Sequence, residues 1–192
     1  EPTYLPDGGI AFCSDRCNRW VNCWLTQVAV MYRCDGDGGN ITQLSSNNEH
    51  ENTPWPLPDG RILYQRWEYI DRSQVHYHHL WTMNPDGTGQ MVFYGNMHPG
   101  TLMIDAKPVP GTREVVAIFS PGHGRREHRG AVTLVSPALG PDAPAAAHRY
   151  PEGEVLPFFA FRSSICLVSM AISWASLLFS SFNFETITEK WT

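Results

Sequence analysis

Short apolar runs alternate with polar turns along most of the chain. Three such runs are Ile10-Ala11-Phe12, Ile62-Leu63-Tyr64 and Val115-Val116-Ala117-Ile118-Phe119, and a turn rich in Pro, Asp or Gly precedes each of them. Short runs of β-branched and aromatic residues that are bounded by turn residues are typical of β-strands. No apolar pattern with helical spacing is sustained before residue 160, and the frequent prolines would interrupt a helix. The pattern therefore predicts an all-β fold.

The turns before these runs recur at a fixed interval. The phrases Leu5-Pro6-Asp7-Gly8, Leu57-Pro58-Asp59-Gly60 and Val109-Pro110-Gly111 place their prolines 52 residues apart. A period of this size, with hairpin turns between short strands, is typical of propeller blades that have four strands each. We expect an incomplete β-propeller of about three four-stranded blades, and we expect Leu57, Ile62 and Tyr64 to be buried. The blades are expected at residues 1–50, 51–103 and 104–150, within a domain that covers residues 1–157.

The end of the chain differs from the repeats. Residues 163–183 carry no charge and no proline. About 20 uncharged residues match the thickness of a bilayer, although serines dilute the hydrophobicity of this segment. Residues 158–192 are therefore expected to form an atypical tail, either helical or disordered. The two interpretations are a membrane segment and a truncated or frame-shifted end, and the second is preferred.

The repeated turns resemble those of the TolB-type, or PD40, family of β-propeller repeats, which are related to WD40 repeats. A narrower similarity is carried by the blocks that run from Asn52 to Tyr69 and from Phe119 to Gly124, which resemble the propeller-bearing region of hydrazine synthase alpha subunits and their uncharacterised relatives. The resemblance implies an extracytoplasmic, periplasmic or cell-surface propeller inside a longer protein that can carry c-type haem. The haem-attachment signature Cys-x-x-Cys-His is absent from this chain. Covalent haem is therefore expected only elsewhere in such a protein.

Four of the five cysteines lie close together in the first repeat, at Cys13, Cys17, Cys23 and Cys34. An even group of cysteines in a loop-rich, exported segment favours disulfides, and three pairings are open. A hairpin between the first two apolar runs would bring Cys13 or Cys17 near Cys34. The alternatives are unpaired structural thiols and a zinc site, although the spacing lacks the close pairs that are typical of zinc ligands.

Histidines form a second candidate group. His76, His78 and His79 precede the apolar run at residues 80–83. If the extended conformation begins early, His76 and His78 lie on one face and His79 on the other. Imidazole binds several transition metals, but no carboxylate or third ligand is fixed by the spacing. We expect no metal here, and we retain these three histidines as the candidates for one.

Charge and missing motifs narrow the functional classes. The net charge of -5 and the absence of a basic stripe argue against nucleic acid as a partner. No motif for nucleophilic, metallopeptidase or phosphate-binding chemistry is present, so catalytic and cofactor-binding residues stay unassigned. The preferred hypothesis is a propeller segment of a larger extracytoplasmic protein that provides a protein-binding or assembly scaffold. The alternative is a part of a hydrazine synthase alpha-like multihaem oxidoreductase that itself attaches no haem. In it, histidine-bearing loops such as His76 to His79 or Gly122-His123-Gly124 would approach a haem of a neighbouring domain.

Overall fold

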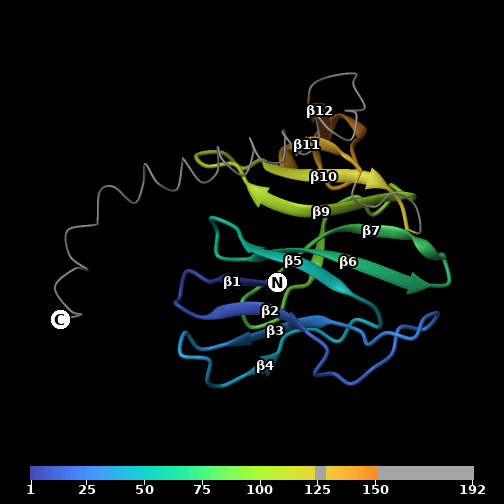
Figure 1. The fold of residues 1–192 in the computed structure, drawn as a ribbon. Helices are drawn as coiled ribbons and strands as arrows, with labels where there is room; N and C mark the ends of the chain where they lie inside the picture. Colours follow the sequence, from blue (N-terminus) through green and yellow to red (C-terminus); the bar gives the residue numbers. More distant parts are fainter. Residues whose placement is uncertain (124–128, 151–192) are drawn as a thin grey trace. The chain divides into compact units, whose positions relative to one another are not determined.

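The computed structural model describes residues 1–123 and 129–150, and these residues form an all-β fold with two short 3-10 helices (Figure 1). The expected tail at residues 158–192, including the candidate membrane segment and Cys166, lies outside the described residues. No helix in the described part is long and apolar enough to cross a bilayer.

The strands follow one another as three antiparallel meanders of four strands each. The first meander contains β1 (Pro2–Tyr4), β2 (Ile10–Ser14), β3 (Val30–Cys34) and β4 (Thr42–Gln43). The second contains β5 (Glu51–Pro56), β6 (Ile62–Ile70), β7 (Ser73–Met83) and β8 (Met91–Tyr94). The third contains β9 (Thr101–Pro108), β10 (Val115–Pro121), β11 (Ala131–Val135) and β12 (Ala147–Tyr150), and the helices η1 (Pro137–Leu139) and η2 (Pro144–Ala146) lie between its last two strands.

The second and third meanders share one open sheet. A short parallel pairing joins β7 to β9, through Tyr77 with Thr101 and His78 with Leu102. The first meander forms a sheet of its own. The expected boundary between residues 103 and 104 falls inside β9, because the third meander already begins at Thr101.

The repeated turns close with the same hydrogen bonds. The Leu5 amide donates to the Gly9 carbonyl at 2.8 Å, and the Leu57 amide donates to the Arg61 carbonyl at 2.8 Å. In the third repeat the corresponding bond runs from the Val109 amide to the Glu114 carbonyl, so this turn is one residue longer. Asp7 and Asp59 also each accept a bond from the backbone amide two residues ahead, which is how Asp favours tight turns.

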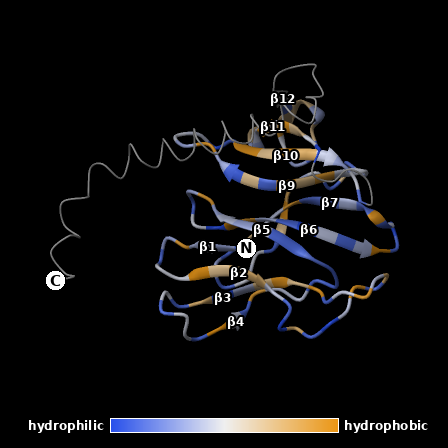
Figure 2. Ribbon diagram, viewed as in Figure 1, coloured by the Kyte–Doolittle hydropathy of each residue, from blue (hydrophilic) through white to orange (hydrophobic). Residues whose placement is uncertain are grey.

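Apolar stretches, orange in Figure 2, lie on strands such as β2 and β10. Alternate residues of β6 face two different cores. Ile62 and Tyr64 pack against the first meander in a cluster that includes Met31, whereas Leu63 points to the third meander. The cluster on that side contains Leu57, Leu63, Leu80, Tyr94, Met103, Ala106, Val115, Ala117, Val135 and Ala146. The expected burial of Leu57, Ile62 and Tyr64 is confirmed, with exposed fractions of 6%, 0% and 0%.

Candidate functional site

The strands that open the three meanders are linked by hydrogen bonds between residues 52 positions apart. A Glu1 carboxylate oxygen accepts a bond from the Thr53 amide at 2.6 Å, and the Thr53 hydroxyl accepts one from the Asp105 amide at 3.3 Å. Thr53 and Asp105 both have left-handed backbone conformations, with φ of 53° and 55°. Non-glycine residues seldom hold this conformation unless the surrounding structure imposes it. The repeat therefore builds the same irregularity into β5 and β9.

A cavity of about 340 Å³ lies beside this series of linked residues. It is the candidate site because it gathers carboxylates, amides, imidazoles and an indole that come from all three meanders. Its lining residues are Glu1, His50, Asn52, Thr53, Gln65, Trp67, His78, Leu102, Ile104, Asp105 and His123.

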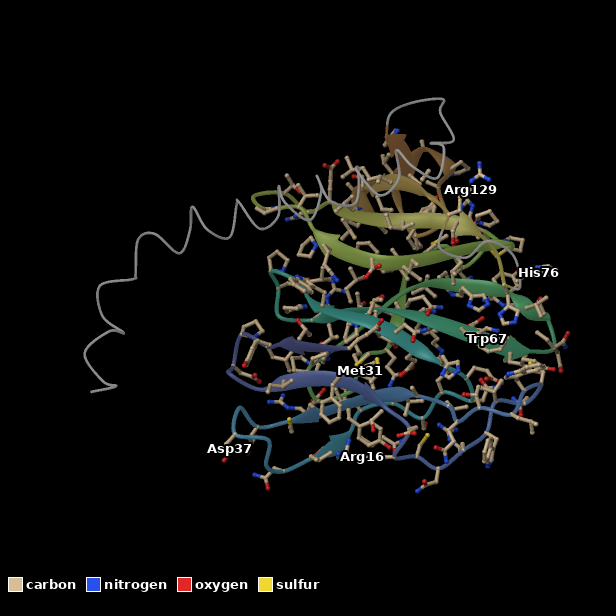
Figure 3. The ribbon with its side chains drawn as sticks, viewed as in Figure 1. Arg16, Met31, Asp37, Trp67, His76 and Arg129 are labelled. Atoms are coloured by element: carbon tan, nitrogen blue, oxygen red, sulfur yellow. The ribbon has the colours of Figure 1, made fainter. Side chains whose placement is uncertain are left out.

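Stacked aromatic rings form one wall of the cavity. The ring of Trp67 lies 5.2 Å from that of His78 and 4.6 Å from that of His123, and the two imidazoles are 5.2 Å apart. His50 stacks on Trp67 at 6.2 Å. Trp67 and His78 face each other across the β6–β7 pair, and His123 follows β10. Figure 3 labels Trp67 and His76 near the same end of the β6–β7 pair.

A hydrogen-bond chain fixes the orientation of His78. The Asn52 side-chain amide donates to the Gln65 oxygen at 2.8 Å, so the Gln65 nitrogen is left to face His78 Nδ1 at 3.4 Å. Nδ1 then acts as the acceptor, and the proton lies on Nε2, which has no well-aligned partner among the described residues. Burial lowers the pKa of His78 to about 3; the nearby His123 acts in the same direction and the Val75 backbone in the opposite one. His78 is therefore a neutral N–H donor at physiological pH.

Two buried carboxylates lie next to His50 in the chain. Glu49 and Glu51 are fully covered, and burial raises the pKa of both. One oxygen of Glu51 accepts bonds from the Met31 amide at 3.0 Å and from the Ser45 hydroxyl, while its other oxygen has no partner in the described part of the chain. Neither carboxylate lines the cavity.

The three histidines proposed as metal candidates do not converge. β7 does begin early, at Ser73, and His78 and His79 are buried whereas His76 is exposed. Because successive side chains of a strand point to opposite faces, His79 lies on the other face from His78, as expected. Within residues 1–123 and 129–150, no three His, Cys, Asp or Glu side chains are arranged to hold a metal ion. The arrangement suits hydrogen bonding and ring stacking better than metal ligation.

The four cysteines of the first meander are free thiols. The register pairs Cys13 with Met31 and Cys34 with Ile10, so Cys13 and Cys34 lie on opposite faces of the sheet. The Cys17 thiol donates to the Val28 carbonyl at 3.2 Å. Val28 lies six residues before Cys34, which is roughly 20 Å along an extended chain. The structure therefore does not bring Cys34 near Cys13 or Cys17. A bridge that involves the exposed Cys23 stays a prediction.

A larger cavity of about 520 Å³ lies between turns of the second and third meanders. Of its two arginines, Arg61 and Arg113, the first already pairs with Asp59 at 2.7 Å and bonds to Thr82. None of its lining residues has a buried polar side-chain atom without a partner, whereas His78 of the histidine cavity does. For this reason it is the weaker candidate.

Sequence reasoning identified His78 and His123 separately but missed the cluster that they form. Counting back from the β6–β7 turn, where Ile70 pairs with Ser73, would place His76 opposite Trp67; a register shift between Glu68 and Ile70 places His78 there instead, so the sequence held only part of that signal. The approach of His123 depends on how the third meander lies against the second, and local sequence carries no signal for it. Comparison of the chain with protein-family models and with curated proteins finds no match.

Proposed function

We propose that the three meanders are consecutive blades of a β-propeller in a larger extracytoplasmic protein, where they provide a protein-binding or assembly scaffold. The 52-residue period, the equivalent turns and the resemblance to TolB-type repeats support this proposal. The extracytoplasmic location and the larger protein come from that resemblance.

One observation carries the proposal: the same face of each meander is used for packing on its predecessor. Ile62 and Tyr64 of β6 pack on the first meander, and Val115 and Ala117 of β10 pack on the second. By the repeat, the equivalent residues of β2 are Ile10 and Phe12, which are half-buried. On the same face the ring of Tyr4 is 74% exposed. This face is expected to pack against a further blade.

The test compares the 192-residue chain with a longer form that includes the proposed upstream blade. Ile10→Ser is expected to cost little in the shorter chain and clearly more in the longer one, where Ile10 becomes covered. The matched variant is Ile62→Ser, which should destabilise both forms strongly because Ile62 is fully buried. An equal loss of stability from Ile10→Ser in the two forms would contradict the proposal that a further blade covers Ile10. Co-purification of a defined partner with the longer form, and its loss on removal of the propeller, tests the scaffold role.

A second candidate is the non-haem part of a multihaem oxidoreductase. The observation that favours it is the meeting of His78 and His123 beside Trp67 at an open cavity, since these two loops were expected to approach a neighbouring cofactor. The visible spectrum of the longer protein tests this candidate. A haem band that shifts when His123 is replaced by Ala supports it, and a spectrum without haem overturns it.

A further inference from the structure

The histidine cavity, which is the space of about 340 Å³ beside Trp67, combines aromatic rings with carboxylates. Trp67 lies on β6 (Figure 3), and its ring lies 5.2 Å from that of His78 and 4.6 Å from that of His123. The carboxylates belong to Glu1 and to Asp105 of β9. Residues from all three meanders thus bring rings and negative charge to one small space.

The charged groups of this lining are acidic. Glu1 and Asp105 supply two carboxylates, and none of the described lining residues is Lys or Arg. Burial lowers the pKa of His50 and of His78, so both imidazoles are neutral near neutral pH. The balance of charge around the histidine cavity therefore attracts a cation and repels an anion.

The neighbouring cations of the protein are engaged elsewhere. Lys107 follows Asp105 by two residues, but its Nζ lies over the ring of Trp55 at 4.3 Å and forms no ion pair with a described carboxylate. Asp105 attracts this ammonium only weakly, because burial still lowers the pKa of Lys107. The amino group of Glu1 acts on the Cys13 thiol, and Cys13 does not line the cavity. The described part of the chain therefore leaves the two carboxylates without a cation of their own.

The imidazoles of the lining have already used their acceptor nitrogens. His50 Nδ1 accepts the Ala29 amide at 3.1 Å, so the His50 proton lies on Nε2. His78 Nδ1 faces the Gln65 side-chain nitrogen at 3.4 Å in the same way. A protonated amine needs acceptors for its own N–H groups, and these two imidazoles cannot supply them. A quaternary ammonium ion has no N–H group, and its methyl groups can pack on the rings and on Leu102, which also lines the cavity.

We propose that the histidine cavity binds a small quaternary ammonium ion, with Asp105 as its counter-ion and the rings of Trp67, His78 and His123 against its methyl groups. Aromatic rings attract such cations through the negative potential of their faces. The volume of about 340 Å³ suits a small molecule. A metal ion is disfavoured, because no three His, Cys, Asp or Glu side chains within residues 1–123 and 129–150 are arranged to hold one. The inference does not depend on the propeller assignment.

The test is a calorimetric titration of the full chain with choline and with dimethylbutanol, the uncharged analogue in which carbon replaces the nitrogen of choline. Choline is expected to bind, and the analogue should bind about fivefold more weakly or less. Asp105→Asn should weaken choline binding by about fivefold, because it removes the carboxylate. Asn tolerates the φ of 55° that Asp105 holds, so this variant keeps the backbone. The matched control is Asp37→Asn, at an exposed turn outside the cavity, which should leave choline binding unchanged.

A second measurement locates the bound ion in the wild type and so does not rely on the folding of a variant. Choline should shift the NMR ring signals of His78 and His123 and leave those of the exposed His148 in place. The proposal is overturned if choline does not bind, if dimethylbutanol binds equally well, or if the folded Asp105→Asn variant binds choline as the wild type does. Shifts at His148 without shifts at the two cavity histidines would also overturn it, because choline would then bind elsewhere.

Discussion

Several titratable side chains are buried at sites that disfavour their charged forms. A change in pH therefore alters the stability of the protein in opposite directions through the acidic and the basic groups. Glu51 is held in a site that disfavours its carboxylate form, whereas His78 and His79 are held in sites that disfavour their protonated forms. The stability of the protein is therefore expected to depend on pH at both ends of the mildly acidic range.

Glu51→Gln is expected to stabilise the protein at neutral pH. Burial raises the folded-state pKa of Glu51 above the ordinary value of 4.5. At pH values between these two pKa values, the native state therefore binds more protons than the unfolded state. The stability of the wild type consequently falls as pH rises through this range. The amide removes this slope while its oxygen still accepts the bonds from Met31 and Ser45. Urea midpoints measured from pH 4 to pH 8 check the prediction, with Asp37→Asn as an exposed control. A slope that persists in the variant would contradict it.

His79→Leu is expected to stabilise the protein in acid. Burial lowers the folded-state pKa of His79 to about 3, with Arg72 and Arg66 acting in the same direction. The unfolded state therefore binds more protons below pH 6.5, and stability is lost as pH falls from 6.5 towards 3. Both ring nitrogens lack partners in the described structure, so leucine gives up no hydrogen bond. Unfolding followed at pH 7 and pH 5 should show a gain for the variant that grows in acid. The exposed His148→Gln serves as the control, and an equal gain at both pH values would exclude this mechanism.

The tight turns are the elements that the sequence predicts best. Pro-Asp-Gly and Asp-Gly phrases specify their own conformation, because Asp bonds to the local backbone and Gly tolerates positive φ. The strands beside them were predicted for the same reason, and so was the burial of Ile62 and Tyr64. The placement of His123 on Trp67, and of Cys34 away from Cys13, depends on register and on sheet packing between distant segments. Local sequence does not encode these features, so they were missed.

Gly87→Ala and Gly38→Ala form a matched pair at the same position of two equivalent turns. Both glycines have φ near +85°, and each donates its amide to the carbonyl three residues earlier. A Cβ at Gly38 would meet nothing within 4 Å, whereas one at Gly87 would clash with the Leu44 backbone of the first meander. Gly38→Ala should cost about 1 kcal/mol from backbone strain alone, and Gly87→Ala clearly more. Chemical denaturation of the two variants measures the difference. Equal costs would show that this turn does not fasten the first two meanders together.

At the scale of the whole molecule, the proposed open ring has a cost in stability. The first meander leaves the face that bears Tyr4, Ile10 and Phe12 only partly covered, and uncovered apolar sheet faces favour association. We expect the isolated chain to bind the dye ANS and to sediment as a concentration-dependent mixture. Tyr4→Ser combined with Ile10→Ser should reduce both effects, whereas Met97→Ser should not. A sharp, reversible melt of a monomer that binds no ANS would refute this expectation.

The hydrogen bonds between residues 52 positions apart also constrain how such a chain can change in length during evolution. Glu1 with Thr53 and Thr53 with Asp105 each join equivalent positions of successive repeats. An inserted residue that shifts one member of such a pair would break the bond at that junction. The one-residue insertion in the third turn follows Asp105, beyond the last of these bonds. Natural variants of this chain should therefore preserve the strand segments that bear Glu1, Thr53 and Asp105, and they should gain and lose residues mainly in connecting loops such as the segment between β2 and β3.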